Sequence, residues 1–338
     1  MRAAVIGSGA WGTALAISLC RNGHSVTLWV HNPDRIAQLE ETRINPRLPG
    51  VLLPESLNFS SDPACAADCQ LVVIASPSFP IRSVCQKVAP YIDDSAVVVS
   101  VTKGLEFGTH LRMSQVVSQE TNKEVVVLTG PSHAEEVARN LPTGLLAACE
   151  NRKKAELVQD AFMSDSLRVY ISPDPVGAEL GGALKNVIAL CAGITDGLGC
   201  GDNTKAMLMT RGLTETARLG LMLGAQKDTF AGLAGVGDLI VTCTSMHSRN
   251  RRAGILIGQG STPQQAMEAV GAVVEGYYAT KSTYELGQQL GIDIPITQAA
   301  YRVLYEGANV RDTFLELMNR QKKPELEDAG WEPAALDS

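Results

Sequence analysis

A glycine-rich turn near the start of the chain constrains the fold more than any other feature of the sequence. The apolar segment AAVIG runs directly into Gly7-Ser8-Gly9-Ala10-Trp11-Gly12, a match to GxGxxG, and the helix-compatible TALAISLCRNG follows. Gly7 permits a tight strand-to-helix turn, Gly9 lets the backbone approach a pyrophosphate, and Gly12 lets the helix pack closely on the strand. Phosphates at this helix N-terminus would meet unpaired N–H groups. The segment therefore predicts a dinucleotide-binding βαβ unit.

The next predicted strand, SVTLWV, ends at His31-Asn32 without an acidic residue at its tip. In NAD-binding units an Asp or Glu at this place holds the ribose hydroxyls, whereas here Asp34 lies a few residues farther on. A neutral or basic tip tolerates a 2′-phosphate. The sequence therefore allows NADPH as well as NADH, and His31 can equally be a solvated loop residue.

The first half of the chain alternates short β-branched runs with helix-compatible stretches, which is the pattern of βαβ units and a parallel sheet. Several runs are apolar at consecutive positions, as expected where helices cover both faces of a sheet. The predicted strands are 3–6, 25–30, 71–75, 96–101, 125–129, 145–149 and 167–171. The expected fold class is α/β, with a doubly wound Rossmann domain at the N-terminus.

The pattern changes at Ser172-Pro173-Asp174-Pro175, where two prolines interrupt regular structure. From there on, apolar residues recur at helical spacing, for example at every third or fourth residue from Leu184. We therefore expect a dinucleotide-binding domain over residues 1–175 and an all-helical domain over 176–320. Residues 321–338 are charged and contain prolines, and they are expected to form a mobile tail.

Composition excludes several classes of protein. With 338 residues, 45% hydrophobic, the chain can bury a large core, and its net charge of −7 argues against broad binding to nucleic acid or to membrane surfaces. No apolar run reaches the ~18 residues of a membrane span, and no secretory signal opens the sequence. We expect a soluble, cytoplasmic protein that is not inserted in a membrane. The 8 cysteines are dispersed, which predicts reduced thiols and no metal site.

Polar residues that follow the predicted strands are the first candidates for function, because ligands in open α/β sheets bind outside the carboxyl ends of the strands. Lys103 follows the strand SAVVVSVT and would place an ammonium group where substrate and nicotinamide meet. A solvated surface lysine is the alternative. After the next strand, Ser132 and Glu135 fit a capping box, which predicts a helix start and with it an anion site.

Lys185 and Asp238 are the candidates of the second half. Lys185 lies outside the apolar stripe of its predicted helix and shares a row with Gly181 and Ala189, which would leave space for a substrate. Partial burial should lower its pKa, as proton transfer near neutral pH requires; an ordinary exposed lysine is the alternative. Asp238 closes a glycine-rich stretch and is either a helix N-cap or a group that orients a lysine or a substrate hydroxyl.

A cationic run, Ser248-Arg249-Asn250-Arg251-Arg252, stands out in this acidic chain. It is either a solvated loop or a site for a phosphate monoester, because arginine binds phosphate oxygens in pairs. Glu275 by itself is typical of a surface acid at a helix end.

Seven segments taken together resemble the bacterial NAD(P)-dependent glycerol-3-phosphate dehydrogenase family, in order and with the right spacing from residue 1 to about residue 315. They are GSGAWGTALA, LWVHNP, VTKGLE, TGPSHAEE, LGGALKNVIALCAGITDGLG, AGVGDLIVTCTSMHSRNRR and VVEGY. The resemblance implies a helical substrate and dimerisation domain like that of 6-phosphogluconate dehydrogenase, and a homodimer. It also implies that NADPH or NADH reduces dihydroxyacetone phosphate to sn-glycerol 3-phosphate for glycerophospholipid synthesis.

The same resemblance assigns roles to individual residues. It makes Lys185 the catalytic proton donor and acceptor, has Lys103 contact both ligands, and has Asp238 support the catalytic lysine and the substrate. The substrate-binding positions are matched by Lys103, Gly130, Ser132, Lys185, Asp238, Ser248, Arg249 and Asn250. The cofactor positions are matched by Ala10, Trp11, His31, Lys103, Ala134, Arg249, Val273 and Glu275, beside Gly7, Gly9 and Gly12 of the turn. Two residues depart from the family pattern: Ala10 replaces a frequent serine, and His133 replaces a frequent phenylalanine.

Two other functions remain compatible with the residues. One is a reductase of the same architecture that acts on a 2-keto or 3-hydroxy acid, which would leave the cationic run without a phosphate to bind. The other is a non-catalytic NAD(H) redox sensor, against which the two lysines argue.

Overall fold

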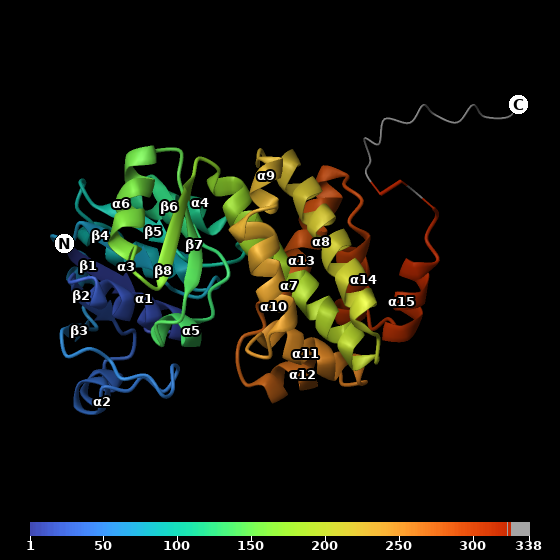
Figure 1. The fold of residues 1–338 in the computed structure, drawn as a ribbon, viewed down its shortest axis with the longest axis horizontal. Coiled ribbons are helices and arrows are strands. Elements are labelled where there is room, and N and C mark those ends of the chain that lie inside the picture. Colours follow the sequence, from blue (N-terminus) through green and yellow to red (C-terminus); the bar gives the residue numbers. More distant parts are fainter. Residues whose placement is uncertain (323, 326–338) are drawn as a thin grey trace, which may run out of the picture.

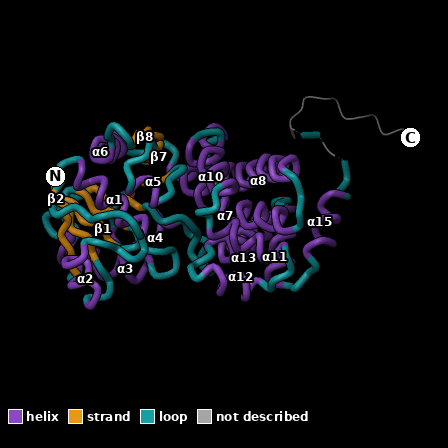
Figure 2. Tube along the Cα trace, turned by 60° about the horizontal axis from the view of Figure 1, so that its bottom comes forward, coloured by secondary structure: helices purple, strands orange, loops and turns teal. Residues whose placement is uncertain are grey.

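The computed structural model describes residues 1–322 and 324–325, and it divides into a sheet-containing half and a helical half (Figure 1). Figure 2 shows that the strands gather in the N-terminal half alone. Most of the predicted tail over 321–338 lies outside the described residues.

The N-terminal half is built on one eight-stranded sheet with the order β3-β2-β1-β4-β5-β6-β7-β8. Its strands are β1 (Arg2–Ile6), β2 (Ser25–Trp29), β3 (Leu57–Ser60), β4 (Leu71–Ile74), β5 (Val97–Ser100), β6 (Val125–Thr129), β7 (Thr143–Ala148) and β8 (Leu167–Ser172). The seven predicted strands are all present, each end within two residues of its prediction. β3 was not among the predicted strands; it is a four-residue edge strand in which only Leu57 is buried.

The expectation of a wholly parallel sheet is wrong at one place, because β7 runs antiparallel to β6. The two strands are joined through α5 (Ala134–Ala138), a helix of only five residues. The connection begins and ends at the same end of the sheet, so the chain returns in the opposite direction. All other neighbouring strands pair in parallel.

Helices cover both faces of the sheet, which explains the runs of consecutive apolar residues. In β1, Ala3 and Val5 pack in one core cluster with α1 (Ala10–Arg21) and α6 (Arg152–Phe162). Ala4 and Ile6 pack in another with α3 (Ile81–Val88) and α4 (Met113–Thr121). α2 (Asp34–Thr42) follows β2 along the chain.

The C-terminal half consists of helices, as the spacing of its apolar residues predicts. They are α7 (Pro175–Gly197), α8 (Asp202–Met222), α9 (Lys227–Phe230), α10 (Asp238–Thr244), α11 (Arg249–Gly258), α12 (Pro263–Val270), α13 (Glu275–Leu290), α14 (Pro295–Tyr305) and α15 (Val310–Met318). The predicted break at the two prolines is the start of α7. Asp174 caps this start by accepting a hydrogen bond from the Gly177 N–H (2.8 Å), and Pro175 occupies the first helical position.

α7 is the central helix of this half and packs against α8, α10, α11 and α13. By length and composition α7 could cross a membrane, but its apolar window is completely buried by the rest of the chain. A helix that is apolar on all sides belongs in a core when other helices surround it.

Glycines let α11 approach α7 at backbone distance. A Cβ at Gly193 of α7 would lie 2.1 Å from the carbonyl oxygen of Arg251, and a Cβ at Gly254 of α11 would lie 2.1 Å from that of Leu190. Gly197 and Gly258 repeat the arrangement one turn farther on. The start of α11, which carries the cationic run, is placed by this contact.

Gly254→Ala is therefore expected to lower the free energy of unfolding by about 2 kcal/mol, since a methyl group against a backbone carbonyl forces the helices apart. The better helix propensity of alanine offsets only part of this loss. Chemical denaturation measures the change. The control is Gly201→Ser at the N-cap of α8, where a Cβ meets nothing within 4 Å. Equal stability of the two variants would contradict the close-packing argument.

Candidate active site

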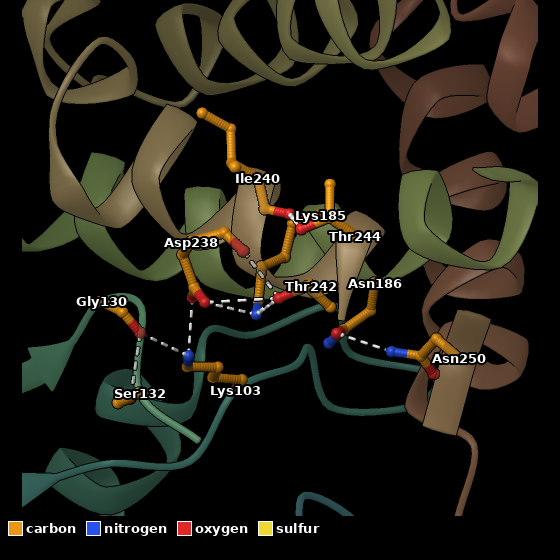
Figure 3. Close-up of polar contacts among 10 residues, drawn as sticks. All are labelled: Lys103, Gly130, Ser132, Lys185, Asn186, Asp238, Ile240, Thr242, Thr244 and Asn250. Atoms are coloured by element: carbon orange, nitrogen blue, oxygen red, sulfur yellow. Dashed lines mark hydrogen bonds and ion pairs between the residues drawn. The ribbon is translucent and has the colours of Figure 1, made fainter. Parts of the chain in front are cut away.

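Segments from both halves of the chain meet at one polar cluster (Figure 3). The segment after β5 provides Lys103, and the segment after β6 provides Gly130 and Ser132. From the helical half, α7 provides Lys185, and α10 provides Asp238 together with Thr242. The carboxyl ends of two strands thus face the core helix of the other half, as expected for a ligand site in this class of fold.

The cluster is centred on the carboxylate of Asp238, which is only 1% exposed. Lys103 Nζ donates to Asp238 Oδ2 (2.6 Å) and to the carbonyl oxygen of Gly130 (3.1 Å). Lys185 Nζ donates to Asp238 Oδ1 (2.5 Å) and to the hydroxyl of Thr242. That hydroxyl donates in turn to the backbone carbonyl of Asp238 (2.6 Å). Each ammonium group is therefore held by a separate carboxylate oxygen.

The charges of the cluster do not cancel, because one carboxylate faces two ammonium groups. The pKa of Lys185 falls from 10.5 to about 8: burial lowers it most, the charge of Asp238 raises it, and the charge of Lys103 lowers it. The expected lowering of this pKa is thus confirmed, and the alternative of an exposed helical lysine is wrong, since Lys185 is 7% exposed. The cluster can hold an anion and exchange a proton near neutral pH.

The prediction that Gly181 and Ala189 leave space for a substrate beside Lys185 is wrong. A Cβ at Gly181 would lie 2.4 Å from the carbonyl oxygen of Ala234, so a backbone segment fills the space that was expected to take a substrate. Ala189 is fully buried in an apolar cluster with Leu239. Gly181 instead allows the segment before Asp238 to pack against α7, and Ala189 belongs to the apolar core that α7 shares with α10.

The two local capping interpretations are also wrong. Asp238 is not an N-cap: it is the first residue of α10, which follows a π-helical turn over Leu233–Gly237, and its carboxylate turns to the lysines. Ser132 caps no helix, because α5 begins at Ala134 after His133, and the Ser132 hydroxyl donates to the Gly130 carbonyl (3.0 Å). The tertiary partners of these segments prevail over the local pattern.

The cationic run is the beginning of α11 and not a solvated loop. Ser248 is its N-cap, and the Ser248 hydroxyl accepts a hydrogen bond from the Arg251 N–H (3.2 Å). Arg251 turns away from the start of the helix and donates to Asp196 (2.8 Å) and to the carbonyl of Thr244 (2.6 Å). Arg249 and Arg252 are exposed. Only some of these arginines are therefore available to a ligand.

Asn250 ties three helices together beside the cluster. Its Nδ2 donates to Asn186 Oδ1 of α7 (2.8 Å), and its Oδ1 accepts from the N–H of Gly276 in α13 (2.9 Å). Asn186 and Thr242 are site residues that the sequence analysis missed. Their positions beside predicted site residues could have indicated them: Asn186 follows Lys185 directly, and Thr242 lies one helical turn after Asp238.

The glycine-rich turn has the shape that a pyrophosphate needs. Gly7 adopts φ +128°, and a Cβ there would lie 2.6 Å from the Ala75 carbonyl oxygen, while a Cβ at Gly12 would lie 2.1 Å from that of Gly7. A Cβ at Gly9, in contrast, would meet nothing within 4 Å. Among the described residues, no side chain caps the start of α1. The open space over Gly9, at a helix start with unpaired N–H groups, fits the phosphates of a dinucleotide.

The other predicted cofactor residues lie outside the lysine cluster. Glu275 is the first residue of α13 and accepts a hydrogen bond from Ser78 after β4 (3.0 Å). It joins the two halves of the chain, and burial raises its pKa, so its interpretation as a surface acid is wrong. Val273 and His31 are exposed. Ala10, Trp11 and Ala134 lie in the first turns of α1 and α5.

His133, whose role the sequence left open, lies next to this site. Its ring is 5.5 Å from that of His247, which precedes the cationic run, and among the described residues its Nε2 has no hydrogen-bond partner although it is buried. Burial lowers the pKa of His133, while the charge of Glu136 raises it and that of Lys185 lowers it. Across residues 1–322 and 324–325, no three His, Cys, Asp or Glu side chains are grouped as metal ligands would be.

Comparison with known proteins agrees with this geometry. Residues 2–155 match the description NAD-dependent glycerol-3-phosphate dehydrogenase N-terminus, and residues 174–315 match the C-terminus of the same family. The Glycerol-3-phosphate dehydrogenase [NAD(P)+] of Thermoanaerobacter sp. (strain X514) is 50% identical over 327 residues, which are 96% of this chain and 99% of that protein. That of Moorella thermoacetica is 51% identical over 330 residues, or 97% and 98%.

A solved structure is similar over nearly the same length. The glycerol-3-phosphate dehydrogenase of Coxiella burnetii superposes with a TM-score of 0.90 at 38% identity, covering 94% of this chain and 99% of the other.

The cluster geometry leads to a prediction about the pKa of Lys185. Asp238→Asn should lower it below about 8, because the attraction of the carboxylate is lost and the repulsion by Lys103 remains. A pH titration of the lysine side-chain NMR signals measures it, with Lys185→Arg to assign the signal. Thr242→Val is the matched control, since it removes a hydrogen bond but no charge, and its shift should be smaller. An unchanged Lys185 pKa in Asp238→Asn would refute this electrostatic account.

Proposed function

The chain belongs to the NAD-dependent glycerol-3-phosphate dehydrogenase family, and from that premise we propose that it reversibly reduces dihydroxyacetone phosphate to sn-glycerol 3-phosphate. It is an NAD(P)-dependent oxidoreductase. The observation that carries the proposal is the buried cluster of Lys103, Asp238 and Lys185, which holds an excess positive charge at the carboxyl ends of β5 and β6. The product would supply the backbone of glycerophospholipids.

Lys185 is the proposed proton donor to the substrate. When bound, the reduced nicotinamide supplies the hydride for the carbonyl carbon. Lys185 would protonate the oxygen on which negative charge develops, and its pKa of about 8 leaves it protonated yet weakly basic at neutral pH. Asp238 and the Thr242 hydroxyl hold the ammonium group in one orientation. After the transfer, the buried neutral amine is no longer penalised by desolvation.

Lys103 is the proposed electrostatic partner of the reacting oxygen. It is held by Asp238 and the Gly130 carbonyl, and its ammonium group is aimed at the same carboxylate as that of Lys185. A charge fixed in this way requires little reorganisation when the oxyanion forms. Gly130 and Ser132 lie beside it as the proposed substrate-binding positions.

The start of α11 is the proposed phosphate site. Arg249 is exposed there, Ser248 caps the helix, and the helix dipole favours an anion at this end. Arg251 is already held by Asp196 and Thr244, so its role is to position the segment. The proposed role of Asn250 is to orient this segment against α7 while one of its amide hydrogens stays available.

We propose that residues 1–175 bind the dinucleotide and residues 176–320 bind substrate and dimerise. Exposed apolar residues on α8 and α15, among them Met222 and Met318, support a homodimer through the helical half. All eight cysteines are free thiols, which supports a reducing compartment such as the cytoplasm.

The state of Lys185 predicts opposite pH profiles for the two directions. Reduction needs the protonated lysine, so its kcat/KM should fall as pH rises through about 8, whereas the kcat/KM of oxidation needs the neutral amine and should rise over the same range. Initial rates in both directions measure this. Lys185→Met should lower kcat by about 10²- to 10⁴-fold, while Lys227→Met, an exposed lysine on α9, should not. Near-normal turnover of Lys185→Met would exclude it as the proton donor.

Substrate choice tests the reaction itself. We expect NAD(P)H oxidation with dihydroxyacetone phosphate and little with unphosphorylated dihydroxyacetone. Arg249→Ala should raise the KM for the phosphorylated ketone by about 10-fold or more, because a charge-assisted hydrogen bond is lost. Arg252→Ala, the exposed neighbour in the same helix, is the control. No turnover of either ketone, despite cofactor binding, would favour another reductase or a redox sensor.

A further inference from the structure

The imidazole of His133 has a buried nitrogen that lacks a hydrogen-bond partner. His133 as a residue is partly exposed, but its Nε2 is buried and makes no hydrogen bond within residues 1–322 and 324–325. Such an atom is costly, because it has lost water without gaining another partner. Atoms of this kind are rare in native structures, and a functional role is one explanation for them. The surroundings of the ring indicate which role it has.

The segment that carries His133 lies between two parts of the proposed substrate site. At its start, the carbonyl oxygen of Gly130 accepts a hydrogen bond from Lys103 Nζ (3.1 Å) of the lysine cluster. At its end, the His133 ring lies 5.5 Å from the ring of His247. His247 directly precedes Ser248, the N-cap of α11, where the phosphate site is proposed. The ring therefore belongs to the region between the lysine cluster and the phosphate site.

The groups around His133 leave its ring mainly neutral at pH 7. Burial lowers its pKa below the ordinary 6.5; the charges of Glu136 and Glu135 on α5 raise it, and those of Lys185 and His247 lower it. A bound dianion would reverse the balance, because a nearby negative charge favours the protonated ring. A protonated imidazole donates from both nitrogens, so Nε2 would then carry a hydrogen for the anion.

We propose that His133 binds the phosphate of the substrate through its Nε2–H and takes up a proton from solvent as it does so. This inference rests on the proposed function, because the ligand is the phosphate of dihydroxyacetone phosphate or glycerol 3-phosphate. His133 would reach the phosphate from the sheet half, whereas Arg249 reaches it from the helical half. The proton stays on the ring while the phosphate is bound and returns to solvent when the phosphate leaves.

Proton uptake by His133 gives substrate affinity a dependence on pH. The pKa of the ring is below 6.5 in the free chain and higher in the complex. The extra affinity is therefore fully present below the free pKa and is lost as pH rises through the bound pKa. The substrate phosphate titrates near pH 6 and acts in the opposite direction. Its effect is the same in wild type and in a variant of His133, so a comparison of the two removes it.

Calorimetry measures the proton directly. Glycerol 3-phosphate is titrated into the full chain saturated with NADH, a pair that cannot react because both molecules are reduced. Buffers of different protonation enthalpy give the number of protons taken up. We expect wild type to take up about half a proton more per ligand, at about pH 7.5, than His133→Gln, which keeps an N–H donor but cannot be protonated. His24→Gln is the matched control and should behave as wild type, since His24 contacts Met1 and the Ala161 carbonyl instead.

Steady-state kinetics then separate binding from support of the fold. His133→Gln should raise the KM for dihydroxyacetone phosphate about 10-fold near pH 6.5 and only about 2-fold near pH 9, with kcat changed less than about 3-fold. His133→Phe removes the donor and should raise the KM at both pH values. Phenylalanine is frequent at this position in the family, so this variant should fold.

Two results would overturn the proposal. One is equal proton uptake by wild type and His133→Gln. The other is a rise in KM that is the same at both pH values, which would make His133 a structural residue. Loss of proton uptake in His133→Gln, combined with no turnover of dihydroxyacetone phosphate by wild type, would overturn the proposed function and leave the His133 site in place.

Discussion

The site depends on the carboxylate of Asp238, which is buried between two ammonium groups from different halves of the chain. Lys103 follows a strand of the Rossmann sheet, and Lys185 lies in the core helix of the helical half. A buried ion that loses one partner costs about 3–5 kcal/mol, so this contact fixes the two halves against each other as well as the reacting groups. It also sets the protonation chemistry, because burial and the charge of Lys103 lower the pKa of Lys185 to about 8 even though Asp238 raises it.

Close backbone packing around α7 is what allows this arrangement. Gly181 lets the segment before Asp238 lie against α7, and Gly193 and Gly254 bring α11 to the same helix at backbone distance. The carboxylate, the catalytic lysine of the proposed mechanism and the start of α11 are therefore attached to one rigid element. Sites held on packed helices keep their geometry better than sites on loops. In the N-terminal half, the buried side chain of Asn45 connects α2 to the glycine-rich turn. It accepts a hydrogen bond from Arg35 and donates one to the carbonyl oxygen of Ser8.

Local patterns predicted elements better than they predicted contacts. The strand runs and the helical spacing were visible because burial on both faces requires consecutive apolar residues and a core helix requires a 3.6-residue period. β3 escaped detection because an edge strand of four residues carries almost no pattern. The capping interpretations of Ser132 and Asp238 failed because their side chains have stronger partners elsewhere in the fold. Glu275 had the features of a surface acid, yet it contacts Ser78 across the two halves.

The sequence alone was sufficient for the dinucleotide-binding turn, the order of a sheet half and a helical half, and the family resemblance, because these depend on residue types at short and regular spacing. Only the tertiary structure decided that Asp238 bridges Lys103 and Lys185. It also decided that Arg251 turns to Asp196. The same holds for the amide oxygen of Asn45, which accepts from the Arg35 side chain and from the backbone N–H of Arg47. The physical reason is that burial and charge pairing come from segments far apart in the chain. Lys103 and Asp238 are separated by 135 positions, and no local period records such a contact.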